Sequence, residues 1–150
     1  MTRWGKFREL PRGERRLLVR SWWLVGSVRV GLWLLPYARL RRILDRRCEI
    51  PLEWRTPRPD PERIAWAVTV ASEYFPRAET CLTRALAALY WLRRFGHPAE
   101  LKLGVALDER KEFSAHAWVL SEGRVVIGDD GHGEFTPLES PPSGGPPSTV

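Results

Sequence analysis

A cysteine, a histidine and an acidic pair in this sequence could together carry out acyl-transfer chemistry. Cys81 lies near the start of Ala78–Gly96, a segment with helical apolar periodicity, directly after Thr80, a good helix-capping residue type. The unpaired N–H groups of a helix N-terminus favour a thiolate. The same groups can stabilise the oxyanion that forms when a thiolate attacks a carbonyl. Taken alone, a small buried cysteine is the simpler interpretation of this position.

A histidine further along the chain favours the catalytic interpretation. His116 lies in FSAHAWVLS, and RVVIGDD follows after Glu122–Gly123, so the sequence predicts a tight hairpin of two strands. A two-residue turn places His116 opposite Asp129, with about 5 Å between the Cβ atoms. In that geometry a carboxylate can orient an imidazole. A three-residue loop would instead place Asp130 on the histidine face, so we favour Asp129 and keep Asp130 as the alternative.

The two faces of the predicted histidine strand have different roles. One face should pack on the core and contains Phe113, Ala115, Ala117 and Val119. His116 shares the other face with Ser114 and Trp118, where a groove could form.

The remaining candidate residues give weaker signals. His97 follows the helix-ending Gly96 and is expected to be a turn residue, and His132 is expected in a loop near the acid pair. Cys48 is expected to be an inert thiol. Two cysteines and three histidines lack zinc-ligand spacing, and no phosphate-binding glycine loop occurs, so we expect neither a metal nor a cofactor.

The composition is that of a globular domain with an uneven charge distribution. The 150 residues are 43% hydrophobic and 28% charged. Residues 1–58 hold 15 Lys and Arg against 5 Asp and Glu, whereas residues 59–150 hold 9 against 13. The basic half could contact nucleic acid, an anionic membrane surface or an acidic peptide, or it could simply be a solvated helix face.

The chain shows no targeting or membrane-spanning signal by its pattern. The first apolar run has no small-residue cleavage site, and three arginines (Arg20, Arg29 and Arg39) interrupt the stretch from Leu17 to Leu40. Two cysteines do not form a disulfide framework. We therefore expect a cytoplasmic protein.

The elements that must position the site follow from local patterns. Residues 13–47 predict one or two helices broken at Pro36, and Cys48–Glu62 predicts a proline-rich linker. Asp60 and Pro61 predict a helix start, with Ile64, Val68 and Ala71 buried up to about Tyr74. Gly96 should end the cysteine helix. The pattern then alternates from Ala99 to Leu107, and the tail from Glu139 is expected to be disordered.

These motifs resemble a known family. CLTRALAALYWLRRFGHPAELKLGVAL followed by FSAHAWVLSEGRVVIGDD resembles the transglutaminase-like cysteine peptidase of lasso-peptide biosynthesis, which cuts the leader from a ribosomally made precursor. The similarity covers roughly Cys81 to Leu138, and the apolar, arginine-rich helical region ending in LLPYARLRRIL resembles the family's N-terminal part more weakly.

The resemblance implies an α+β fold with a papain/transglutaminase-like core. A helix bearing the cysteine would pack on an antiparallel sheet bearing the histidine and the aspartate, beside an N-terminal helical region. It implies Cys81 as nucleophile, His116 as general base and then acid, and Asp129 as the orienting group. The implied division is residues 1–58 as helical region and linker, 59–138 as catalytic core and 139–150 as tail.

The resemblance also implies partners. Members act with a leader-binding protein, the RiPP recognition element, and this chain looks like the split form that lacks it. A separate ATP-dependent cyclase would follow. We expect the basic N-terminal helices to contact the partner–leader complex rather than nucleic acid, with peripheral membrane contact as an alternative. A transglutaminase-like acyltransferase and a non-catalytic peptide-binding module are the competing functions.

Overall fold

The computed structural model describes residues 8–49, 58–75, 80–107, 110–128 and 136–138. Within these ranges, the helices are α2 (Arg12–Leu34), α3 (Tyr37–Cys48), α4 (Pro61–Ser72) and α5 (Thr80–Arg94). Four strands are β1 (Glu100–Leu107), β2 (Phe113–Ser121), β3 (Arg124–Ile127) and β4 (Thr136–Leu138). The strands form one antiparallel sheet in the order β3-β2-β1-β4. The predicted α+β class is confirmed.

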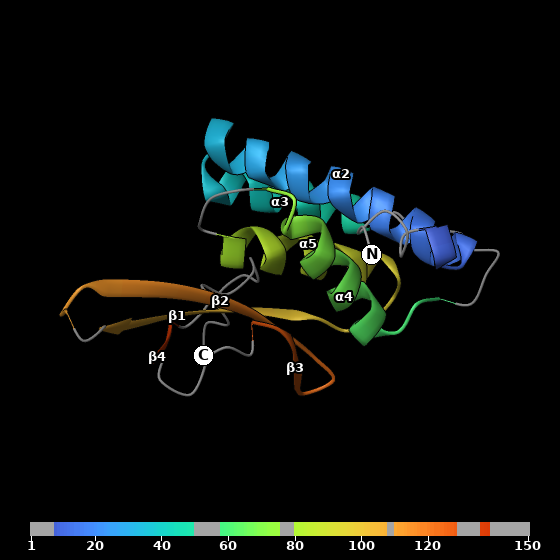
Figure 1. The fold of residues 1–150 in the computed structure, drawn as a ribbon. Helices are drawn as coiled ribbons and strands as arrows, with labels where there is room; N and C mark the ends of the chain where they lie inside the picture. Colours follow the sequence, from blue (N-terminus) through green and yellow to red (C-terminus); the bar gives the residue numbers. More distant parts are fainter. Residues whose placement is uncertain (1–7, 50–57, 76–79, 108–109, 129–135, 139–150) are drawn as a thin grey trace, which may run out of the picture.

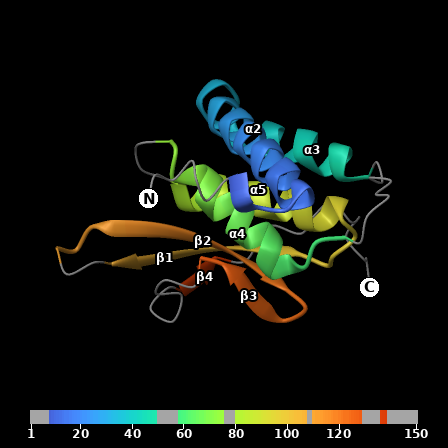
Figure 2. The same cartoon turned by 45° about the vertical axis from the view of Figure 1, so that its right-hand side comes forward.

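The helices and the sheet form successive layers (Figure 1, Figure 2). α2 and α3 lie on the outside, and α4 and α5 lie between them and the sheet. α5 contacts α2, α3 and α4 as well as β1, β2 and β3. One continuous core joins these layers, so the N-terminal helices share their packing with the rest of the chain. Its fully buried members include Val25, Val28, Ile64, Val68, Leu86, Leu92 and Val119.

The break between α2 and α3 follows from local sequence. Pro36 immediately precedes α3 with φ −58°, which matches the fixed φ of its ring, and it has no N–H to continue α2. The chain then turns back so closely that a Cβ at Gly31 would lie 2.8 Å from Leu40 Cδ1. A glycine at position 31 therefore permits α3 to pack against α2.

The start of α4 and the end of α5 also form as predicted. Pro61 is the first residue of α4, after Asp60 in an extended conformation, and Ile64, Val68 and Ala71 are buried. At the end of α5, Gly96 has φ +80°. Its N–H donates to Arg93 O at 3.0 Å, and the His97 N–H donates to Leu92 O at 2.8 Å. This pair of bonds is a Schellman motif, which requires the left-handed backbone that glycine tolerates.

His97 is more than a turn residue, contrary to the sequence-based expectation. Its side chain is buried, and its Nε2 lies 2.8 Å from Pro59 O. Because a carbonyl oxygen only accepts, Nε2–H must be the donor. Arg58 Nη1 reaches the carbonyls of Phe95 and Gly96 beside it, at 3.4 and 3.3 Å. The chain before α4 is thus fastened to the C-terminal end of α5.

The predicted hairpin between β2 and β3 is present. Glu122 and Gly123 both have positive φ, 52° and 78°, as a two-residue type I′ turn requires. Ser121 pairs with Arg124 and Leu120 with Val125, but Val119 pairs with Ile127, one residue further along than the turn register gives. A β-bulge therefore shifts the register towards His116. β4, which pairs with β1, was not predicted.

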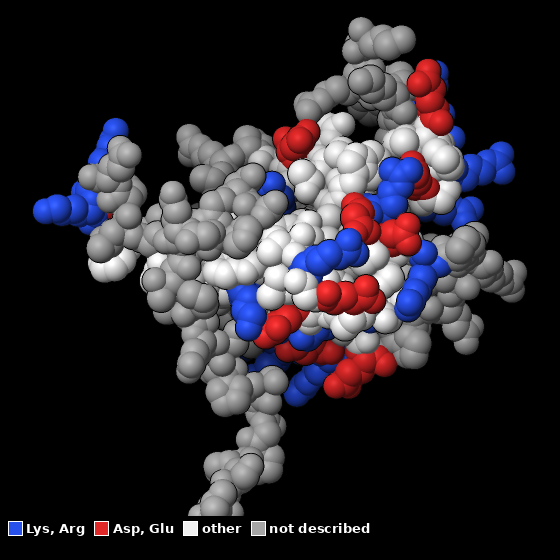
Figure 3. All heavy atoms as spheres, turned by 90° about the horizontal axis from the view of Figure 1, so that it is seen from below, with Lys and Arg blue, Asp and Glu red and all other residues white. Residues whose placement is uncertain are grey.

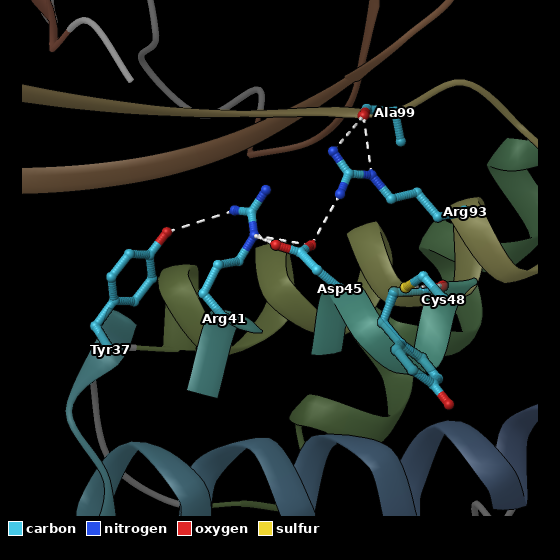
Figure 4. A network of polar contacts seen from close by, with 7 residues as sticks. Tyr37, Arg41, Asp45, Cys48, Arg93 and Ala99 are labelled. Atoms are coloured by element: carbon cyan, nitrogen blue, oxygen red, sulfur yellow. Dashed lines mark hydrogen bonds and ion pairs between the residues drawn. The ribbon is translucent and has the colours of Figure 1, made fainter. Parts of the chain in front are cut away.

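A polar network fastens the outer helix α3 to the core (Figure 4). Asp45 accepts hydrogen bonds from Arg41 at 3.2 Å and from Arg93 of α5 at 2.9 Å. Arg93 also donates to Ala99 O, just before β1, at 3.4 Å. One half-exposed carboxylate thus links α3, α5 and the approach to β1.

Helix α2 is unusually apolar for an outer helix. By length and composition alone α2 could cross a membrane, which the interrupting arginines did not lead us to expect. Most of this apolar helix is not buried in the fold. Its buried stripe (Leu17, Leu18, Ser21, Val25 and Val28) packs in the core against α4 and α5. The opposite side of α2 is exposed and also apolar.

Replacing His97 with leucine should destabilise the fold. The change would leave the part-buried carbonyl of Pro59 without its donor, at a cost of about 1–1.5 kcal/mol in the free energy of unfolding. Urea denaturation measures this cost. Arg124→Ala is the control, because the Arg124–Glu62 pair is largely exposed and should contribute under about 1 kcal/mol. Equal stability of both variants would contradict this role for His97.

Candidate active site

Cys81 lies where the sequence places it, in the first turn of the central helix. It is half-buried and is the second residue of α5. Thr80 is already part of the helix, so it does not precede the helix as the predicted N-cap. The early position still places the Cys81 backbone among N–H groups that have no partner within the helix, which is the feature that acyl-transfer chemistry needs.

His116 is held by the sheet. It lies in β2 opposite Gly104 of β1, is half-buried, and its Nε2 lies 2.9 Å from Gly128 O. The carbonyl can only accept, so Nε2–H donates and, in the neutral ring, Nδ1 keeps the lone pair that can accept a proton. The ring also stacks on Trp118, with 6.1 Å between centroids and 25° between planes.

Gly128 can present its carbonyl to His116 because it is a glycine. Its φ is +86°, and a Cβ there would lie 2.7 Å from Ala117 O and 2.8 Å from Trp118 Cβ. Both the conformation and the contact exclude a side chain. Sequence reasoning considered the acidic pair and overlooked the glycine before it, although an isolated glycine at the end of a strand pattern signals a close backbone approach.

The predicted division of β2 into two faces holds for only half of the strand. Ala117 and Val119 are buried in the core that the helices share, but Phe113 is 81% exposed and Ala115 is exposed. The helical layer therefore ends near residue 116. Phe113 and Ala115 alternate along the strand as predicted, but no described helix extends far enough to bury them.

Strand alternation bears directly on how the thiol and the imidazole could meet. Because neighbouring side chains point to opposite faces, His116 lies on the face turned away from Ala117 and the helices. α5, which carries Cys81, packs across β2 from the helical side. A Cys81–His116 pair would have to form at the margin of the helical layer, beside the exposed Ala115. This pairing stays a prediction.

The acid partner lies outside the described residues. Asp129, Asp130 and His132 all fall in the range 129–135. The turn is the two-residue turn that favoured Asp129, but the bulge before Ile127 changes the pairing, so the turn register cannot be extended to His116. Asp129 therefore stays a prediction, with Asp130 as its alternative.

The other cysteine differs from Cys81 in its surroundings. Cys48, at the end of α3, is a free thiol whose Sγ donates to Tyr90 O at 3.8 Å. Burial raises the pKa of the Cys48 thiol, and the nearby Arg93 offsets this only in part. A raised pKa keeps this thiol protonated and unreactive near neutral pH. Within the described ranges, no group of three His, Cys, Asp or Glu residues could hold a metal ion.

The fold and these residues define a class: an α+β protein with a cysteine at the start of a central helix that packs on an antiparallel sheet bearing a histidine. The chain belongs to the transglutaminase-like superfamily, whose family profile matches residues 22–140. Members of this superfamily are typically cysteine enzymes of the peptidase or acyltransferase kind. Searches among curated proteins and among solved structures found no match.

The bond to Gly128 O predicts the tautomer of His116. Neutral His116 should carry its proton on Nε2, because that nitrogen must donate to a carbonyl. Long-range ¹H–¹⁵N correlation spectra of the imidazole distinguish the two tautomers. Gly128→Ala should disturb this preference, whereas Gly13→Ala in α2 should not, since its backbone has no positive φ and nothing lies within 4 Å of a Cβ at position 13. A proton on Nδ1 in the neutral wild-type ring would contradict the assignment.

The two cysteines should react at different rates with iodoacetamide near neutral pH. Cys81, near the N-terminus of α5, should be alkylated first, because burial raises the pKa of Cys48 and keeps it protonated. Peptide mass spectrometry over a time course measures both rates, with Cys48→Ser as the control that leaves the rate at Cys81 unchanged. Faster modification of Cys48 would count against a reactive Cys81.

Proposed function

We propose that this protein is a cysteine peptidase that removes the leader from a ribosomally made lasso-peptide precursor. Membership of the transglutaminase-like superfamily supports cysteine chemistry. The observation that carries the proposal is the joint arrangement of Cys81 in the first turn of α5 and of His116 on β2, which α5 contacts, with Nε2–H bonded to a backbone carbonyl. The lasso-specific substrate is supported by the sequence resemblance alone.

The proposed reaction begins with transfer of the Cys81 thiol proton to His116 Nδ1. The thiolate attacks the carbonyl at the leader–core junction, and the α5 N-terminus stabilises the tetrahedral oxyanion. The C–N bond then breaks, the core amine takes the proton from His116 and leaves, and the leader remains as a thioester. Water, deprotonated by the same ring, adds to the thioester and releases the leader carboxylate and the thiol. Because Nε2–H bonds to Gly128 O, we assign both proton transfers to the other ring nitrogen, Nδ1.

We propose that the protein acts in the cytoplasm with a separate leader-binding partner, the RiPP recognition element. The partner would present the precursor, and the freed amine would be the substrate of an ATP-dependent cyclase. This chain would supply the thiol and the imidazole, and the partner would supply recognition of the leader.

Acyl transfer to an amine is the second candidate function, because members of the superfamily include acyltransferase-like proteins. The same thioester could be released by an amine in place of water. Product analysis separates the two reactions, since hydrolysis gives a leader with a free carboxylate and transfer gives an amide.

Cleavage of the precursor should depend on Cys81 and His116. With precursor peptide and leader-binding partner present, the wild-type protein should release the leader, and Cys81→Ala or His116→Ala should lower the rate by at least about 10³-fold. Mass spectrometry of the released fragments is the measurement, and Cys48→Ser is the matched cysteine control with unchanged rate. Unimpaired cleavage by Cys81→Ala would end the proposal.

Substitutions of Asp129 and Asp130 should lower the cleavage rate by different factors. Asp129→Asn should slow cleavage more than Asp130→Asn. Its effect should still be smaller than that of His116→Ala, because the Gly128 carbonyl orients the same ring through Nε2. Single-turnover cleavage rates test this order. A larger loss in Asp130→Asn would assign the orienting role to Asp130.

A further inference from the structure

The outward side of α2 carries an apolar stripe that no other described element covers. Val19, Trp23, Val30 and Leu34 recur at spacings of four and seven residues and therefore share one side of the helix, over about 22 Å. Trp23 is 66% exposed and Leu34 is 64% exposed, and the adjacent Trp33 is 84% exposed. We define these five residues as the α2 stripe. An outer helix in contact with water alone would be polar on this side.

The two helices α2 and α3 are strongly basic. Residues 12–48 contain ten arginines, and Glu14 and Asp45 are their acidic residues. Glu14 pairs with Arg63, and Asp45 pairs with Arg41 and Arg93, so both acids are already engaged by cations. Several of the arginines are exposed on the two helices: Arg12, Arg16, Arg20, Arg39, Arg42, Arg46 and Arg47. The two helices therefore expose both an apolar stripe and an excess of positive charge.

A hollow next to the α2 stripe also combines apolar side chains with arginines. It encloses about 900 Å³ between α2 and α3, with Phe75 and Tyr90 also contributing to its walls. Trp22 stacks on Phe75 at its side, with 5.6 Å between ring centroids. Its charged lining residues are Arg29 and Arg47, and no acidic residue lines it among the described residues. Apolar walls with guanidinium groups match an acyl chain joined to a phosphate.

The opposite side of the molecule has a different surface. α2 lies at one extreme of the fold and the sheet lies at the other (Figure 1, Figure 2). Seen from the sheet side, the described acidic and basic side chains are interspersed (Figure 3). Contact made through α2 would thus leave the sheet, with His116, facing away from the contacted surface.

We propose that α2 and α3 bind the surface of an anionic phospholipid bilayer, with α2 lying in the plane of the interface. The α2 stripe would enter the headgroup region, where tryptophan is favoured because its ring is apolar and its N–H is polar. The arginines would extend to lipid phosphates while their stems cover apolar surface. The sequence alone led us to expect that these helices contact the partner–leader complex. The exposed stripe, which runs along most of one straight helix, fits a flat bilayer surface better. The proposal does not depend on the reaction proposed above.

Vesicle sedimentation of the full chain tests this proposal. The wild-type protein should bind phosphatidylcholine vesicles containing ~30% phosphatidylglycerol at least about tenfold more strongly than pure phosphatidylcholine vesicles. Raising the salt concentration from about 0.1 M should weaken this binding. The double variant Trp23→Ser/Trp33→Ser should lose at least about tenfold in partitioning, because both rings leave water on binding.

The matched control is Phe113→Ser, which removes an equally exposed aromatic ring (81%) from the sheet and should leave vesicle binding unchanged. Unaltered circular dichroism and thermal midpoint should show that the double variant is folded. Failure of the wild-type protein to bind the anionic vesicles, or equal binding by the double variant, would overturn the proposal.

Two further outcomes would reassign the surface to a protein and equally overturn the proposal. One is a dimer in sedimentation equilibrium that the double variant abolishes, which would make a second copy of this chain the occupant. The other is loss of precursor cleavage by the double variant in vesicle-free solution with the leader-binding partner, which would make that partner the occupant.

Discussion

The burial of α5 is the constraint on which the rest of the structure depends. Its residues from Ala85 to Leu92 are all buried, because helices cover one side and the sheet covers the other. A helix that is buried on all sides must be apolar throughout, and ALAALYWL satisfies this requirement. The residues at the two ends of α5 are of other types and have other structural roles. Gly96 and Arg93 end the helix and fasten it to neighbouring elements, and the other end carries Cys81.

Much of this arrangement could be predicted because it depends on the backbone preferences of residues that are close together in the sequence. Pro36, Pro61 and Gly96 mark helix boundaries through their own backbone preferences, and the turn at Glu122–Gly123 needs positive φ at two adjacent residues. Features that depend on tertiary contact could not be predicted. β4 is three residues long and is a strand only because β1 offers it an edge. His97 resembles a turn residue in sequence, yet it is buried because Pro59 lies beside it.

The candidate site shows the same limit more sharply. Residue types and spacing single out Cys81 and His116 as candidates, because the proposed chemistry depends on their own functional groups. The group that contacts the imidazole, Gly128 O, belongs to the backbone, and any residue has such a carbonyl. Its position depends on the β-bulge between β2 and β3 and on Gly128, whose φ is +86°. Together they bring the backbone that follows β3 close to Trp118. A one-residue register shift is too small for periodicity to predict, but it decides which group reaches the ring.

Strand alternation also determines what a working site would require. His116 lies on the face of β2 away from α5, so thiol and imidazole can approach only where the helical cover ends. Gly104, opposite His116 on β1, has no side chain to occupy the space beside the ring, and the exposed Ala115 leaves the adjoining edge of β2 accessible. A peptide that reached this edge would meet little side-chain bulk from either residue. Among the described residues, the absence of a side chain at Gly104 and the exposure of Ala115 therefore fit the proposal that an extended peptide reaches His116 from this margin.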